Sequence, residues 1–134
     1  MKQILLFLFL LATITASAQN SQEMAGTWLW ESPNGQNTMK LELEYENQKI
    51  IRGNHCVVFY QGENSDCKRG EEGFSLNLIK IAEGIYDGTI ESAVSATTGR
   101  ISLQYMKREK AIRFYLKKAP SGKFYMPKEA FLVR

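Results

Sequence analysis

The sequence predicts an all-β protein in which about eight short antiparallel strands follow one another as a meander and close, or nearly close, into a small barrel. Apolar and polar residues alternate with a period of two along most of the chain after Glu23, as expected for half-buried strands. Turn-forming residues separate these runs at short intervals, and no stretch among them has a convincing helical period. Closure into a barrel is expected because it removes the exposed edges of a long sheet.

The second predicted strand has the clearest alternation. In it, apolar residues alternate with charged ones, namely Met39, Leu41, Leu43 and Tyr45 with Lys40, Glu42, Glu44 and Glu46. The full set of predicted strands is Gly26–Glu31, Met39–Glu46, Lys49–Tyr60, Phe74–Ile81, Ile85–Val94, Arg100–Met106, Ala111–Lys117 and Ala130–Val133. The turns expected between them contain Pro33-Asn34-Gly35, Asn47-Gln48, Gln61-Gly62, Glu83-Gly84, Thr98-Gly99, Lys107 to Lys110 and Pro120-Ser121-Gly122.

Residues 1–18 are predicted to be a signal peptide. Lys2 precedes an apolar run over Ile4–Leu11, and Ala16-Ser17-Ala18 supplies the small-x-small pattern that a signal peptidase recognises before Gln19. Residues 19–134 then form a single domain, which we expect to be periplasmic or secreted. An uncleaved anchor is the alternative, but the apolar run is too short to span a bilayer core of about 30 Å. No stable membrane insertion is therefore expected after cleavage.

Cys56 and Cys67 are expected to form a disulfide. Both lie in the part predicted to be exported, where disulfides persist. If residues 61–62 form a two-residue hairpin loop, cross-strand partners have residue numbers that sum to 123, and the two cysteines satisfy this condition. Free thiols remain an alternative, as does a metal site that adds His55 and Asp66. Neighbours on a strand point to opposite faces, which weakens the metal alternative.

Charge is distributed unevenly along the chain. Glu23–Glu91 holds 12 acidic and 6 basic residues, whereas Arg100–Arg134 holds 10 basic and 2 acidic residues. The favoured interpretation is that acidic early strands lie beside basic late strands and form cross-strand ion pairs in the closed sheet. The alternative is a basic contact surface for an anionic glycan, a lipid headgroup or an acidic partner. Nucleic acid is not expected as a partner, because the chain is exported and its net charge is only +3.

The segment Gly26-Thr27-Trp28 resembles the Gly-x-Trp start of the lipocalin and avidin superfamily of barrels. The resemblance implies a lipocalin-like barrel in which the Trp28 indole closes the floor and an arginine from a late strand covers the ring. Arg113 is the candidate by position, and a guanidinium over an indole is a favourable cation–π arrangement. Gly26 is expected to allow a close approach of the backbone at this point.

A second resemblance covers the end of the chain. Residues 121–125 have the sequence Ser-Gly-Lys-Phe-Tyr, which is similar to the Ser-Gly-x-x-Tyr pattern of periplasmic inhibitors of C-type lysozyme. In that family the loop enters the lysozyme cleft. The resemblance implies that Ser121 and Tyr125 contact the enzyme and that Lys128 is a basic contact residue. The second motif of that family, a Tyr followed by Thr-Lys-Gly, is absent.

Taken whole, residues 19–134 resemble small exported β proteins common in Bacteroidetes-type bacteria. The shared features are a Gly-Thr-Trp start, a Cys pair near the middle and a Pro-Ser-Gly-x-x-Tyr-x-Pro-Lys-x-Ala ending, which matches Pro120–Ala130. This resemblance implies a fold and no activity.

The sequence favours binding over catalysis. Its single histidine, His55, has no evident nucleophile and carboxylate beside it. A glycosidase-like carboxylate pair is the alternative, but Glu42, Glu44 and Glu46 share the wet face of one strand, where carboxylates are usually solvated. We therefore expect no enzymatic activity, no cofactor and no metal. The expected ligand is a small apolar molecule in the barrel or an extracytoplasmic protein. The candidate lining residues for the small molecule are Trp28, Trp30, Met39, Leu41, Leu43 and Tyr45.

Overall fold

The computed structural model describes residues 22–134, which form nine β-strands and two single-turn 3-10 helices. The predicted signal peptide and its cleavage site lie outside the described residues. The strands are β1 (Gly26–Glu31), β2 (Thr38–Asn47), β3 (Ile50–Phe59), β4 (Asn64–Cys67), β5 (Leu76–Ala82), β6 (Ile85–Glu91), β7 (Thr98–Met106), β8 (Ala111–Lys118) and β9 (Glu129–Val133), and the 3-10 helices are η1 (Tyr60–Gly62) and η2 (Gly70–Glu72). Within residues 22–134, no helix has the length and apolar composition needed to cross a membrane.

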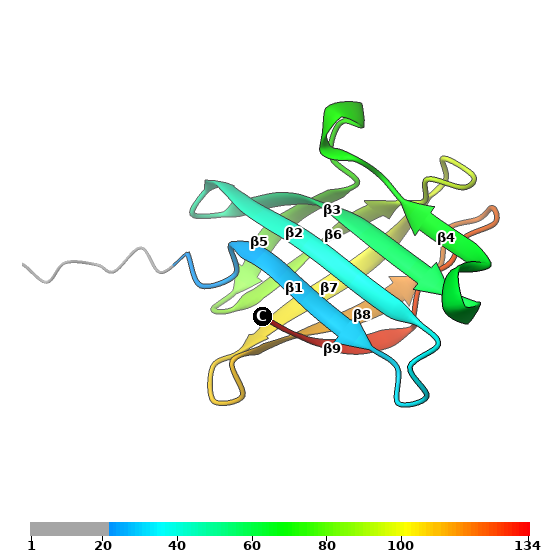
Figure 1. Ribbon diagram of the computed structural model, residues 1–134. Helices are drawn as coiled ribbons and strands as arrows, with labels where there is room; N and C mark the ends of the chain where they lie inside the picture. The colour runs from blue at the N-terminus through cyan, green and yellow to red at the C-terminus, as the bar shows by residue number, and fades with distance from the viewer. Residues whose placement is uncertain (1–21) are drawn as a thin grey trace, which may run out of the picture.

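Eight of the strands close into an antiparallel barrel (Figure 1). Around the barrel the order is β1, β2, β3, β5, β6, β7, β8 and β9, and β9 returns to β1 through the pair formed by Val133 and Leu29. The remaining strand, β4, pairs with the second half of β3, beyond the part that pairs with β5. The predicted all-β fold and the small closed barrel are confirmed, and each of the predicted strands has a counterpart.

The apolar half of each alternating strand fills the barrel interior. Along β2, Met39, Leu41 and Leu43 are buried, whereas the glutamates between them are exposed. Full burial of an aliphatic or aromatic side chain stabilises a fold by about 1.5–3 kcal/mol. The largest fully buried side chains are Trp28, Phe114, Met24, Met39, Leu41, Ile51, Leu76, Leu78, Ile90, Ile101, Leu103 and Ile112. The core therefore occupies the inside of the barrel and is contributed by nearly every strand.

Trp28 is buried at the end of the barrel that carries the β2–β3, β5–β6 and β7–β8 turns, which we call the floor end. The side chain is only 1% exposed, and the indole Nε1–H donates to the Met24 carbonyl oxygen at 3.0 Å. The Tyr105 ring packs edge-on against the indole, with 6.3 Å between ring centres. The guanidinium of Arg134 lies over the indole, 4.5 Å from its centre, and donates to the Ala25 carbonyl oxygen at 3.0 Å.

Arg113 does not cover Trp28, so that prediction is wrong. Its neighbours Ile112 and Phe114 are buried, and strand alternation therefore directs the Arg113 side chain out of the barrel. On the outer face it pairs with Glu129 at 2.6 Å and lies over the Tyr115 ring.

Position 26 favours glycine because of its backbone conformation, not because neighbouring atoms leave no room for a side chain. Its φ angle is +113°, and a Cβ placed there would meet no atom within 4 Å. The predicted close approach is therefore wrong at this position. A close approach occurs instead at Gly53 of β3, where a Cβ would lie 2.1 Å from the Glu42 carbonyl oxygen.

The predicted disulfide between Cys56 and Cys67 is present and joins β3 to β4. The register pairs Cys56 with Cys67 and Phe59 with Asn64, so the residue numbers of the partners sum to 123 as expected. The connection differs from the predicted two-residue loop, because pairing stops at Phe59 and the η1 turn follows. A disulfide of this kind is typical of proteins outside the reducing cytosol.

The predicted compensation between acidic early strands and basic late strands is present only in part: β6 lies beside β7 and β1 beside β9 in the closed sheet. The acidic β2 lies between β1 and β3, whereas the basic β8 lies between β7 and β9. Charges are balanced more locally, as in the ion pair between Arg52 and Glu46 at 3.0 Å. The pair formed by Lys117 and Asp87, at 2.7 Å, joins a late cation to an earlier carboxylate.

Candidate functional site

The end of the barrel opposite the floor end, which we call the loop end, is built from segments far apart in sequence (Figure 1). It includes β4, the β3–β4 connection at 60–63, the β6–β7 connection at 92–97 and the β8–β9 connection at 119–128. Beneath these segments lies a cluster of buried polar side chains, made of His55, Asp66, Ser75 and Ser92. We call these four residues the polar cluster.

His55 projects inward from β3 and is in contact with two other members of the polar cluster. Its Nε2 lies 2.8 Å from Oδ1 of Asp66 on β4, and its Nδ1 lies 2.7 Å from the Ser75 hydroxyl oxygen. The His55 backbone N–H also donates to the Ser75 hydroxyl at 3.1 Å. A neutral imidazole with its proton on Nε2 satisfies these contacts, because it donates to the carboxylate and accepts the serine proton.

Asp66 is the centre of the polar cluster and is fully buried. Besides His55, three donors point at its carboxylate: the Ser92 hydroxyl at 2.6 Å, the Ala93 backbone N–H at 2.8 Å and the Tyr125 backbone N–H at 3.2 Å. One carboxylate therefore joins β3 and β4 to the β6–β7 and β8–β9 connections. The Cys56–Cys67 disulfide also holds β4 to β3. Each cysteine is the next residue after His55 or Asp66, so the bond lies on the opposite, outer face of the strands.

The hydrogen bonds keep Asp66 ionised despite its burial. Burial opposes the charged form, but hydrogen bonds from His55, Ser92 and Ala93 outweigh it and hold the pKa of the Asp66 carboxyl below its usual value. Charge-assisted hydrogen bonds of this kind are about twice as strong as neutral ones. The carboxylate is therefore a firm anchor for the two connections above it.

The polar cluster contains a serine, a histidine and an aspartate, yet it does not form a site that a substrate can reach. His55, Asp66 and Ser75 are each at most 1% exposed. Their hydrogen bonds are made with one another and, through Asp66, with the backbone N–H groups of Ala93 and Tyr125. What this arrangement does is fix the position of the loops.

Three separate connections each present an exposed side chain at the loop end. Tyr60 of the β3–β4 connection is 55% exposed and Val94 of the β6–β7 connection is 41% exposed. Ser121 of the β8–β9 connection is exposed as well. The two later connections are tied directly, because the Gly122 N–H donates to the Thr97 hydroxyl at 3.0 Å. We call Tyr60, Val94 and Ser121 the loop-end surface.

The residues predicted to contact a lysozyme divide into exposed and packed ones. Ser121 and Lys128 are exposed. Tyr125 is half-buried, and its ring packs edge-on against Phe59, with 6.2 Å between ring centres. The ammonium group of Lys123 lies over the same ring at 5.7 Å. The segment is thus folded onto the barrel by Tyr125 and presents Ser121 to solvent.

The six residues predicted to line a ligand cavity are mostly core. Trp28, Met39, Leu41 and Leu43 are at most 5% exposed and pack in one cluster. Trp30 and Tyr45 are partly buried against that cluster. Burial raises the pKa of Tyr45 to about 12, although its hydrogen bond with Met24 acts in the opposite direction. These positions support the packing of the barrel.

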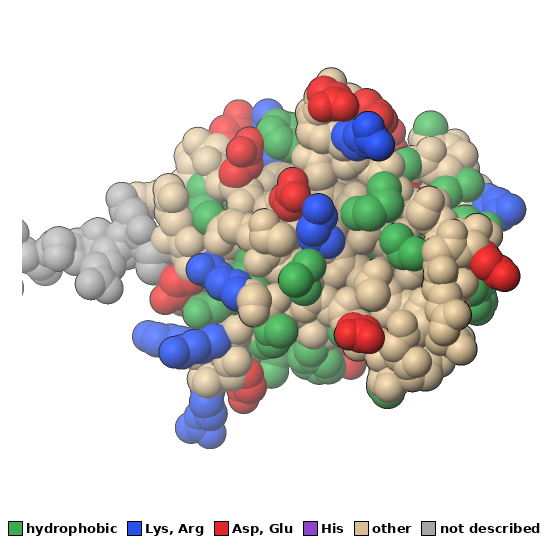
Figure 2. Space-filling view, in the orientation of Figure 1, with side chains coloured by type: hydrophobic (Ala, Val, Ile, Leu, Met, Phe, Trp, Pro, Cys, Tyr) green, Lys and Arg blue, Asp and Glu red, His purple; other side chains and the backbone are tan. Residues whose placement is uncertain are grey.

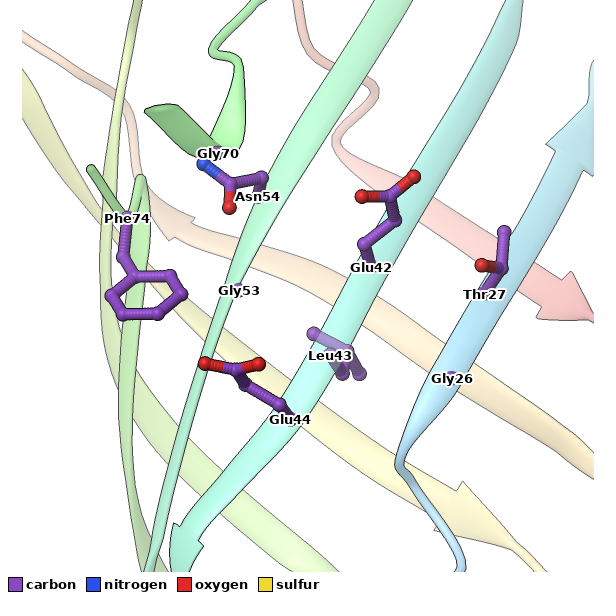
Figure 3. A pocket seen from close by; sticks show the side chains of 9 residues that line it. All are labelled: Gly26, Thr27, Glu42, Leu43, Glu44, Gly53, Asn54, Gly70 and Phe74. Atoms are coloured by element: carbon purple, nitrogen blue, oxygen red, sulfur yellow. The ribbon is translucent and has the colours of Figure 1, made fainter. Parts of the chain in front are cut away.

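A groove of about 380 Å³ lies on the outer face of β1, β2 and β3 (Figure 3). In Figure 3 the carboxylates of Glu42 and Glu44 project from β2, with Thr27 to one side and Phe74 to the other. Glu42 is paired with Lys40 at 3.3 Å. The polar side chains in the groove are exposed or half-exposed, so they form an open, solvated surface.

The polar cluster was missed by sequence reasoning, which considered His55 and Asp66 only as metal ligands together with the cysteines. Cys56 and Cys67 form the disulfide and therefore offer no thiolate to a metal ion. Among residues 22–134, no group of three or more His, Cys, Asp or Glu side chains is arranged to hold a metal ion. One signal was available: in the predicted register Asp66 is opposite Val57, an apolar residue, which places its carboxylate on the inner face.

Comparison with known proteins identifies no relative: no family model, no curated protein and no solved structure matches this chain. The resemblances of the Gly26-Thr27-Trp28 and Ser121–Tyr125 segments therefore remain expectations. Functional conclusions depend on the geometry of residues 22–134.

Proposed function

We propose that this chain is an exported, non-enzymatic binding module that engages a protein partner through its loop-end surface. The observation that carries the proposal is the buried Asp66 carboxylate, which holds two loops from distant parts of the chain on top of β3 and β4. Loops positioned by a rigid scaffold are where binding residues concentrate. Fixing loops before binding also reduces the entropy lost on association.

Burial supports a protein partner over a small apolar ligand inside the barrel. The predicted lining residues Met39, Leu41 and Leu43 pack against one another and the rest of the core. By contrast, Tyr60 and Val94 leave apolar surface exposed at the loop end. Tyrosine is enriched at protein interfaces because its ring buries a large area while its hydroxyl stays hydrogen-bonded.

The disulfide and the predicted signal peptide together support export. The Cys56–Cys67 bridge is stable in an oxidising compartment. Cleavage before Gln19 would release residues 19–134 as the mature chain. The periplasm and the external medium are the two compartments that this proposal allows.

Photo-crosslinking tests the proposed function. p-Benzoylphenylalanine replaces Tyr60, Val94 or Ser121 in turn, and the exported protein is irradiated in intact cells. We expect protein adducts from these three positions, because their side chains are exposed at the proposed interface. Gln104, an exposed residue on the wall of the barrel, is the matched control. Equal labelling from Gln104, or no adduct from the loop-end positions, would contradict the proposal.

Inhibition of a C-type lysozyme is a more specific candidate for the same surface. It is favoured by the exposed position of Ser121 on a loop that Asp66 holds in place. The same crosslinking variants address it when purified protein is mixed with a C-type lysozyme. An adduct from Ser121 accompanied by loss of lysozyme activity supports inhibition, whereas labelling only in cells points to a different protein.

A further inference from the structure

The β7–β8 turn at the floor end is the most basic exposed segment of the barrel. Its four residues, Lys107, Arg108, Glu109 and Lys110, are all exposed and include three cations. In Figure 2 Lys and Arg side chains project into solvent from the region of this turn. Within residues 22–134, none of these three cations forms an ion pair.

This lack of partners distinguishes the turn from several basic residues on the barrel wall. Arg113 and Lys117 of the adjoining β8 are each paired with a carboxylate, at 2.6 Å and 2.7 Å. Lys80 of β5 is paired with Glu83 at 2.9 Å. The positive charge of the turn is therefore available to an external anion, whereas the charges of Arg113, Lys117 and Lys80 are already compensated.

The turn belongs to a continuous face at the floor end. The β5–β6 turn lies beside it, because the Tyr105 N–H donates to the Gly84 carbonyl oxygen at 2.8 Å. The β2–β3 turn joins the same end, since the Lys80 N–H donates to the Lys49 carbonyl oxygen at 2.8 Å. Lys49 adds a further exposed basic residue to this face.

Exposed apolar side chains border the basic face. Ile79 and Ile81 lie on the outer face of β5 as it runs toward the floor end, and each is 60% exposed. Val133, at the end of β9 beside the floor end, is 50% exposed. At the surface of an anionic bilayer, basic residues bind the headgroups and exposed branched apolar side chains enter the adjoining acyl region.

We infer that the floor end binds reversibly to an anionic lipid surface, with Lys107, Arg108 and Lys110 as the headgroup contacts. This interaction lies at the opposite end from the loop-end surface, so the protein can bind a membrane and a protein partner together. Each Lys or Arg near an anionic bilayer strengthens binding by roughly five-fold. The attraction falls with salt because the charges are exposed and screened.

Vesicle co-sedimentation of the mature protein tests this inference. The probes are vesicles of equimolar phosphatidylglycerol and phosphatidylcholine, compared with vesicles of phosphatidylcholine alone. We expect binding to the anionic vesicles only. The variant Lys107→Ser, Arg108→Ser, Lys110→Ser should bind about 100-fold more weakly, because three headgroup contacts are removed.

The matched control removes the same amount of charge from elsewhere. In the variant Arg69→Ser, Arg100→Ser, Lys118→Ser, three exposed basic residues outside the floor end are replaced. This control should keep most of the vesicle binding. Equal loss in both variants would show that net charge alone is responsible, and equal binding to neutral vesicles would show that headgroup charge is irrelevant. Either result overturns the inference, and neither bears on crosslinking at the loop end.

Discussion

Replacing Asp66 with alanine should destabilise the protein by about 3–5 kcal/mol, because several donors lose their buried acceptor and each such loss costs about 1–3 kcal/mol. The substitution leaves four buried or half-buried donors without their acceptor: the His55 ring, the Ser92 hydroxyl and the backbone N–H groups of Ala93 and Tyr125. Urea denaturation against the wild type measures the loss. A midpoint unchanged from the wild type would mean that the carboxylate does not hold the loops.

The contribution of Asp66 should depend on pH in a defined direction. Because its pKa is lower in the folded state than in the unfolded chain, the ionised carboxylate stabilises the fold above the unfolded value of about 3.9. That stability is lost as pH falls below this value and through the folded pKa. The variant Asp66→Asn should therefore show a smaller loss of stability on acidification than the wild type does.

Replacing Trp28 with alanine should cost about 3–5 kcal/mol, as expected for truncation of a large buried aromatic side chain. The change leaves a cavity beside Tyr105, removes the hydrogen bond to Met24 and exposes the Arg134 guanidinium to the gap. Urea denaturation measures the cost, with Trp30→Ala as the matched comparison. Trp30 is only partly buried, so its truncation should cost less.

A Trp28→Ala midpoint equal to that of the wild type would mean that the floor end is not closed by the indole. A larger loss from Trp30→Ala than from Trp28→Ala would also contradict this account, because it would place the better-packed tryptophan nearer the loop end.

The strands were predictable because their signals are local. Met39, Leu41 and Leu43 alternate with glutamates, and this pattern alone determines which face of β2 is buried. The register of the β3–β4 hairpin was also predictable, since a short connection allows few pairings and the cysteines select one. Closure of the barrel was predictable because it removes most of the exposed edges that a sheet of many short antiparallel strands would otherwise have.

The polar cluster was not predictable, because its members meet only after the barrel has closed. Asp66 accepts a hydrogen bond from the backbone N–H of Tyr125, 59 positions later in the chain. Every residue except proline has such an N–H, so the residue type at this position does not indicate the contact. The same limit applies to Arg134, whose position over Trp28 depends on β9 returning to β1. Arg113 was predicted to cover Trp28 because it is an arginine on a late strand. Its neighbours Ile112 and Phe114 face the core, so the Arg113 side chain points outward.

Amide hydrogen exchange at Ala93 and Tyr125 tests most directly whether Asp66 holds the loop end in one arrangement. Both N–H groups donate to this carboxylate in the folded protein. In the wild type they should exchange slowly, at rates comparable with those of strand amides. In Asp66→Asn both should exchange much faster, while the amides of β7 and β8 remain protected. Equal protection of Ala93 and Tyr125 in the wild type and the variant would contradict the central role of Asp66.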